Sequence, residues 1–218
     1  MIHKRLSWLL AAVLLASWLA PAAASEPETL VKGVTEEVLK ILREDKGIQS
    51  GNRQRAVALI ETKVAPHFDF ARMTSLAVGR PWQQASAEQR KVLVGEFRSL
   101  LVRTYANALT AYRDQTVSFK PSPRQGAGDE VTVHSQINKP GVQPISLDYS
   151  LASAAGDWKV FDVAIAGVSL VTNYRNSFAS EVGKGGIDGL IKTLQEKNRS
   201  SATATLPPQL ERQAWRAA

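Results

Sequence analysis

Apolar residues recur every three or four positions through the first half of the chain, which is the spacing of one face of an α-helix. The first such stripe runs from Leu30 to Leu42, with charged side chains on the opposite side. Shorter stripes cover residues 56–64 and 67–78, and sequence breaks near Gly47 and Pro66 separate the three. This half of the chain is therefore predicted to begin with three amphipathic helices.

A capping box marks the start of the strongest helix in the sequence. In the segment Ser86–Gln89 the serine hydroxyl can accept a hydrogen bond from the amide of Gln89, whose side chain can reach back to Ser86. Apolar residues then follow one face as far as Tyr112. A helix of this length, at about 1.5 Å per residue, measures roughly 40 Å and can cross a whole small domain.

The hydrophobic period changes to two in the second half of the chain. Residues 131–137 and 145–151 alternate apolar and polar side chains, as half-buried antiparallel strands do. A shorter strand is predicted at 117–120. Residues 158–165 are apolar on both faces, which favours a central strand.

The helical period returns after Gly167 and continues to Leu194, with a break at residues 183–186. No internal repeat is present. Helices, then four strands, then helices predict one α+β domain. In this fold a roughly four-stranded antiparallel sheet is covered on one face by several helices.

The first 24 residues differ from the rest in composition. They hold 18 hydrophobic residues and no acidic one, carry Lys4 and Arg5 near the start, and end in the small residues Ala22–Ala24. The apolar run 6–20 is shorter than the ~20 residues of a membrane span. We therefore expect residues 1–24 to be a signal peptide that is cleaved before Ser25, with export to the periplasm; a membrane-anchoring helix is the alternative.

The remaining 194 residues carry 25 basic and 20 acidic side chains. This excess is too diffuse to indicate nucleic-acid binding. The chain contains no cysteine, which excludes catalytic thiols, disulfide bonds and thiolate metal sites. We expect residues 25–198 to form a single domain that is stabilised by packing alone, and residues 199–218, rich in Ser, Thr, Ala and Pro, to form a mobile tail.

Neither histidines nor glycines form a recognisable catalytic or ligand-binding motif. His67 and His134, the two histidines left after cleavage, lie in different predicted elements without a metal-ligand spacing. We expect the first to pack or cap and the second to be solvated. The glycine-rich segment 183–189 matches neither phosphate-loop motif and follows a helix, so it predicts a flexible turn.

Asp162 stands inside the apolar run 158–165, where a carboxylate must find hydrogen-bond donors. Asn173 and Arg175 are the candidate donors. A structural pair is favoured over a lone catalytic acid, because no second catalytic group accompanies it. The sequence therefore predicts neither an enzyme nor a cofactor.

Three motifs carry a family resemblance. They are Pro-His-Phe-Asp-Phe-x-x-Met at 66–73, Gly-x-Trp-Lys-Val-x-Asp-Val at 156–163 and Gly-Val-Ser-Leu-Val-x-Asn-Tyr-Arg at 167–175. With shorter matches between them they cover most of residues 30–198, in order, and the last is the most specific. The chain resembles the MlaC family of periplasmic phospholipid-binding shuttles, also described as toluene-tolerance auxiliary proteins.

The resemblance implies a non-enzymatic carrier that moves phospholipids between an outer-membrane lipoprotein and porin complex and an inner-membrane ABC transporter. Such a carrier maintains outer-membrane lipid asymmetry. Family members enclose the acyl chains between sheet and helices and leave the head group near the surface, so phospholipid is the cargo and no cofactor is needed. We expect a monomer.

The faces predicted to point inward supply a hypothesis for the lipid-binding residues. These are Phe97, Leu101, Tyr105, Val133, Ile145, Leu147, Tyr149, Phe161, Val163, Val171, Tyr174 and Phe178. Two other classes of function stay open from the residues alone. One is an accessory subunit of a transporter with a solid core that binds no lipid, and the other is a hydrolase that uses Asp162.

Overall fold

The computed structural model describes residues 26–120, 129–154 and 157–200. The predicted signal peptide lies outside the described residues, and so does the predicted tail apart from its first two positions. Those two, Arg199 and Ser200, end a helix. None of the helices in the three described ranges combines the length and the hydrophobicity that a bilayer span requires.

The longer helices form where the three- and four-residue periodicity predicts them, and one short helix forms at the predicted break near Gly47. The α-helices are α1 (Glu26–Glu44), α2 (Lys46–Gln49), α3 (Arg53–Leu59), α4 (Phe70–Val78), α5 (Ala87–Thr110) and α6 (Leu170–Ser200). A π-helical turn, η1 (Ile60–Val64), and two 3-10 turns, η2 (Ala65–His67) and η3 (Arg80–Gln84), connect them. The predicted capping box is present at the start of α5, with Ser86 Oγ 3.1 Å from the amide nitrogen of Gln89.

The long helix α6 is broken at two glycines. Gly185 and Gly186 leave helical geometry, and Gly186 has a φ of 64°, a conformation that side chains other than glycine disfavour. This break lies in the segment predicted to be a turn. The two arms of α6 both contact α5, the first through Tyr174 and Phe178 and the second through Leu190 and Leu194.

The sheet contains five antiparallel strands in the order β1-β2-β3-β4-β5. They are β1 (Thr116–Phe119), β2 (Glu130–Asn138), β3 (Ile145–Ala154), β4 (Asp157–Ile165) and β5 (Val168–Ser169). The predicted α+β class and antiparallel sheet are confirmed. The fifth strand was not predicted, because its two residues follow a tight turn at Ala166 and Gly167, both with positive φ, and precede α6 directly.

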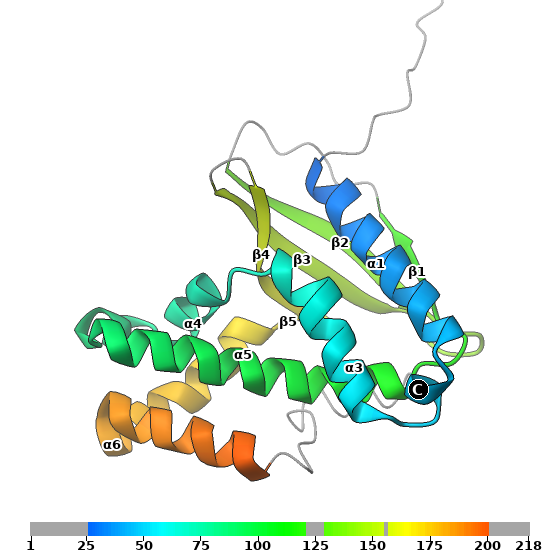
Figure 1. Ribbon diagram of the computed structural model, residues 1–218. Coiled ribbons are helices and arrows are strands. Elements are labelled where there is room, and N and C mark those ends of the chain that lie inside the picture. Colours follow the sequence, from blue (N-terminus) through cyan, green and yellow to red (C-terminus); the bar gives the residue numbers. More distant parts are fainter. Residues whose placement is uncertain (1–25, 121–128, 155–156, 201–218) are drawn as a thin grey trace, which may run out of the picture.

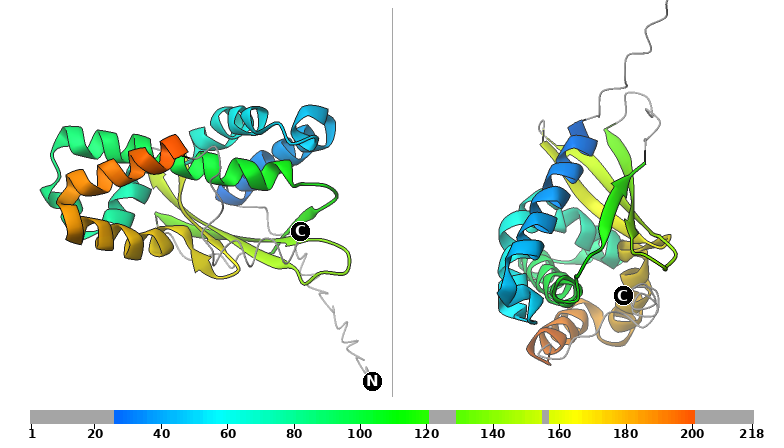
Figure 2. Two further views of the ribbon diagram at one scale, coloured as in Figure 1. Left: turned by 90° about the horizontal axis from the view of Figure 1, so that it is seen from below. Right: turned by 90° about the vertical axis from the view of Figure 1, so that its right-hand side faces the viewer.

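The two faces of the sheet differ in chemistry. The row Val133, Tyr149 and Val163 points toward the helices, and α1 lies across this face (Figure 1). On the opposite face, which none of the described helices covers (Figure 2), His134 Nδ1 lies 2.9 Å from Asp148 Oδ1. This half-exposed pair qualifies the prediction of a merely solvated histidine.

A bulge in β4 changes which of its residues face the helices. Ser150 pairs with Asp162 and Leu151 pairs with Val160, so Phe161 is an extra residue without a partner on β3. Both Val160 and Val163 consequently face the helices, although a strict alternation would place them on opposite sides.

Asp162 stabilises the junction between the sheet and α6. Its carboxylate accepts hydrogen bonds from the hydroxyl of Ser169 at 2.5 Å and from the amides of Val163 at 2.8 Å and Val171 at 3.1 Å. The predicted partners were wrong: Arg175 donates to the carbonyl of Leu76 instead. The carboxylate lies at the start of α6, where the first backbone amides of the helix have no acceptor within the helix, and it accepts the hydrogen bond of one of them.

Replacing Asp162 with asparagine is expected to lower the free energy of unfolding by about 1–3 kcal/mol, because a neutral amide replaces a charged acceptor of three hydrogen bonds. Urea denaturation of the purified protein measures the change. Asp188→Asn is the matched control, since that carboxylate accepts from Gln89 at an exposed position. Equal losses in both variants would contradict the structural role of Asp162.

Candidate functional site

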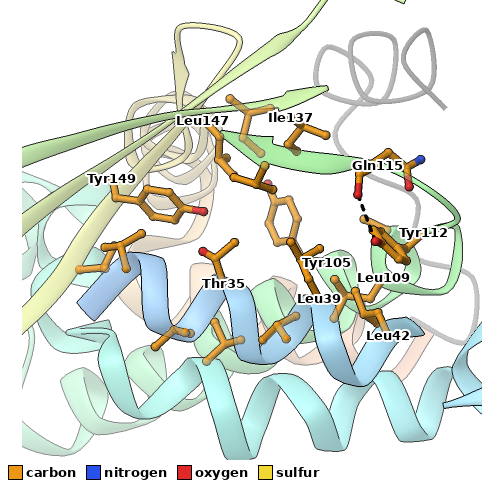
Figure 3. A pocket seen from close by; sticks show the side chains of 18 of the residues that line it. Thr35, Leu39, Leu42, Tyr105, Leu109, Tyr112, Gln115, Ile137, Leu147 and Tyr149 are labelled. Atoms are coloured by element: carbon orange, nitrogen blue, oxygen red, sulfur yellow. Dashed lines mark hydrogen bonds between the residues drawn. The ribbon is translucent and has the colours of Figure 1, made fainter. Parts of the chain in front are cut away.

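A cavity lies between α1, the second half of α5 and the face of the sheet that points toward the helices (Figure 3). Its volume is about 380 Å³, within the roughly 300–1,000 Å³ typical of small-molecule pockets. Helix α1 contributes Leu30, Val31, Val34, Thr35, Val38, Leu39 and Leu42. The strands contribute Val117, Ile137, Ile145, Leu147, Tyr149, Val160 and Ile165. Val64, His67 and Phe68 line it from the segment before α4, and Tyr105, Ala108, Leu109, Ala111, Tyr112 and Gln115 from α5 and the turn after it.

Tyrosine hydroxyls are the main polar groups in this apolar wall. Burial raises the pKa of Tyr149 to about 12, although hydrogen bonding with Thr35 and Ser135 opposes the shift. Burial also raises the pKa of Tyr105 well above its ordinary value. Its hydroxyl has no hydrogen-bond partner among the described residues. Both side chains therefore stay neutral at physiological pH.

The chemistry of the cavity suits an apolar guest. Within the described parts of the chain, no group of three or more His, Asp or Glu side chains could hold a metal ion. The lining has one imidazole, that of His67, and no carboxylate. Such a wall can exclude water from hydrocarbon.

Four of the twelve residues hypothesised to bind lipid line the cavity. They are Tyr105, Ile145, Leu147 and Tyr149. In Figure 3, Leu147 and Tyr149 extend from the sheet toward α1, and Tyr105 lies between these walls.

The other eight lie outside the cavity wall. Phe97, Leu101, Val171, Tyr174 and Phe178 belong to a buried cluster that α4, α5 and α6 form. Val133 and Val163 are buried in a second cluster under the sheet, and Phe161 lies in the β4 bulge with the Arg72 guanidinium 3.7 Å from its ring centre. A role for these eight in lipid contact remains a prediction, and the structure gives them a packing role.

Helix α1 lines the cavity, but none of the twelve residues hypothesised to bind lipid lies in it. Only Pro27, Val31 and Leu42 of its 19 residues are buried, although its apolar stripe continues between them. A long apolar stripe on a helix whose side chains stay half-exposed is typical of a helix facing an unfilled space. The apolar stripe of α1 is visible in the sequence, so the sequence contained the information that could have identified α1 as part of the cavity wall.

Comparison with known proteins points in one direction. The family described as MlaC protein matches residues 32–196. The intermembrane phospholipid transport system binding protein MlaC of Haemophilus influenzae is 25% identical over 177 residues, which cover 80% of this chain and 83% of that protein. The toluene tolerance protein ttg2D of Pseudomonas putida is 28% identical over 186 residues, 84% of this chain and 85% of the relative.

A solved structure agrees with these relatives. The phospholipid-binding protein of Ralstonia solanacearum, determined in complex with a phospholipid, superposes with a TM-score of 0.77 and 38% sequence identity. The match covers 82% of this chain and the whole of that one.

Proposed function

The chain belongs to the MlaC family, and from this premise we propose that it carries phospholipid between two membranes with the acyl chains in the cavity under α1. The similarity to an intermembrane transport protein and to a phospholipid-bound structure supports the carrier role. The observation that carries the proposal is the apolar cavity, about 380 Å³, between α1, α5 and the sheet.

Elementary energetics explains why a carrier is needed. A phospholipid with about 30 methylene groups, at ~0.8 kcal/mol each, faces roughly 24 kcal/mol of unfavourable exposure to water. The cavity removes part of this exposure without a chemical step. A bilayer offers the same refuge, so cavity and membrane must be nearly matched in affinity for cargo to be both loaded and released.

The cellular setting is also part of the proposal. We propose that residues 1–24 direct export and that residues 25–198 act as the lipid-binding domain in the periplasm. The partners are an outer-membrane lipoprotein and porin complex and an inner-membrane ABC transporter, and the outcome is maintained lipid asymmetry. The chain acts as a monomer without cofactor.

Organic extraction tests the carrier role. Protein expressed with its first 24 residues and purified from the periplasm is expected to yield about one phospholipid per chain by mass spectrometry, because the cavity is otherwise a costly void. Protein without phospholipid would favour the competing accessory subunit with no lipid of its own. Detection of phospholipid hydrolysis products with the purified protein would instead favour a hydrolase.

A further inference from the structure

Four residues of the cavity lining are buried, and they lie at its two ends. Val31 and Leu42 of α1 are 5% and 2% exposed, whereas the lining side chains of α1 between them are half-exposed because they face the open space. Val31 packs with Val160 in the cluster under the sheet, and Leu42 packs with Tyr112 in a separate cluster. The open space therefore runs along α1 from Val31 to Leu42.

The length of this space matches the length of an acyl chain in a membrane. Eleven residues of helix at about 1.5 Å each separate Val31 from Leu42 by roughly 16 Å. A hydrocarbon core about 30 Å thick leaves roughly 15 Å for each leaflet of a bilayer. The chains of ordinary bilayer lipids are therefore long enough to fill the cavity from one end to the other.

Leu42 and Tyr112 close one end of the cavity, and we call this pair the end wall. Figure 3 shows the two side chains close together at one end and Tyr149 toward the other. The cluster of the end wall also contains Ile48 and Ala106, which are fully buried and do not line the cavity. The packed interior begins at the end wall, so a chain that reaches it has no space in which to continue.

Hydrogen bonds hold both members of the end wall in place. The Tyr112 hydroxyl donates to the carbonyl of Gln115 at 3.0 Å, so the ring cannot swing aside without losing this bond. The Arg113 guanidinium donates to the carbonyl of Tyr112 at 2.6 Å. On α1, the carbonyl of Leu42 accepts from the side-chain amide of Gln49 at 2.9 Å. The end wall is therefore a fixed boundary of the cavity.

We propose that the end wall sets the length of acyl chain that the cavity buries: the methyl end of a chain stops against Leu42 and Tyr112, and carbons beyond the length of the cavity gain no burial. The inference rests on the proposed carrier function and makes these two residues specificity-determining for its cargo. A zigzag of carbon–carbon bonds of about 1.5 Å advances roughly 1.25 Å per carbon, so about 13 carbons fill the cavity. The ligand class is a phospholipid with chains of at least this length.

Competition in native mass spectrometry tests the proposal. The mature protein is mixed with lysophosphatidylglycerols whose single chains range from about 10 to about 18 carbons, each below its micellar concentration. The affinity of the wild type is expected to rise about fourfold per added methylene while that methylene is buried, and to level off at about 13 carbons. The measured quantity is the chain length at which the affinity levels off.

Two variants move the end wall in opposite directions. Ala111 lines the cavity beside Tyr112 with a φ of −87° and a ψ of −5°, so a leucine there fills the end of the cavity without backbone strain. Ala111→Leu is expected to level off about three carbons earlier, and Leu42→Ala, which removes part of the end wall, about three carbons later. Because Ala111→Leu fills space and leaves no void, it provides the test even where Leu42→Ala does not fold.

Val31→Ala is the matched control, because Val31 lies on the same face of α1 at the opposite end of the cavity. It is expected to weaken the binding of all the probes by one factor and to keep the wild-type levelling point. A levelling point that moves in Val31→Ala, or that stays fixed in Ala111→Leu, would overturn the role of the end wall. Wild-type affinity that rises through the longest chain would overturn it as well and leave the carrier function standing. Failure of every probe to bind would overturn the carrier function itself.

Discussion

Replacing Leu147 with arginine is expected to weaken phospholipid binding by about 100-fold, because an arginine in the cavity stays charged and brings water with it. Leu147 faces the cavity from near the start of β3, beside Ile165 and across from α1 (Figure 3). A loss of about 3 kcal/mol in binding free energy corresponds to that factor. The measurement is phospholipid per chain after extraction, together with circular dichroism to confirm the secondary structure.

Ser146→Arg is the control for this variant. Ser146 is the neighbouring residue on β3 and points to the opposite, polar face, where it pairs in register with Gln136. A guanidinium there is solvated, so bound phospholipid is expected to stay at the wild-type level. A folded Leu147→Arg protein with unchanged lipid content would contradict the placement of acyl chains in this cavity.

Truncation of Phe97 to alanine is expected to lower the free energy of unfolding by about 3–5 kcal/mol and to leave the bound phospholipid unchanged. Phe97 is fully buried, and its ring makes edge-to-face contacts with Tyr174 at 5.0 Å and Phe178 at 5.1 Å between ring centres. Such aromatic pairs add about 0.5–1.5 kcal/mol each to the effect of burial. Urea denaturation measures the loss, and extraction measures the lipid.

Leu109→Ala in the same helix gives the opposite expectation. Leu109 lines the cavity and is only half-buried, so its truncation is expected to cost less stability and to weaken lipid retention. Should Phe97→Ala instead release lipid with little change in stability, Phe97 would belong to a lipid site as the sequence hypothesis had it. Phe97→Leu gives a milder test if the alanine variant does not fold.

These two variants distinguish packing residues from cavity residues on α5, a distinction that the sequence could not make. Phe97 and Tyr105 lie eight positions apart on one face of α5, and the same apolar stripe includes both. The first arm of α6 covers the helix at Phe97, whereas the cavity under α1 begins at Tyr105. Periodicity reports that both side chains point inward and does not report which element they meet.

Strand β4 gives a second instance. The apolar run 158–165 correctly predicts a strand, and its alternation places Phe161 and Val163 on one face. The bulge at Phe161 breaks that alternation, so Val160 joins the cavity wall and Phe161 lies against Arg72. A bulge depends on the pairing of two strands, which residues of one strand do not record.

The sequence by itself determined the order and type of the main elements, the α+β class and the family. These conclusions depend on features of neighbouring residues: the hydrophobic period, the capping box at Ser86 and the motif at 167–175. Such local features can be recognised in the sequence without knowledge of the fold. Only the tertiary structure decided which apolar residues surround a space and which fill one. A cavity exists where α1 stands away from the sheet, and the distance between two elements is a property of neither element alone.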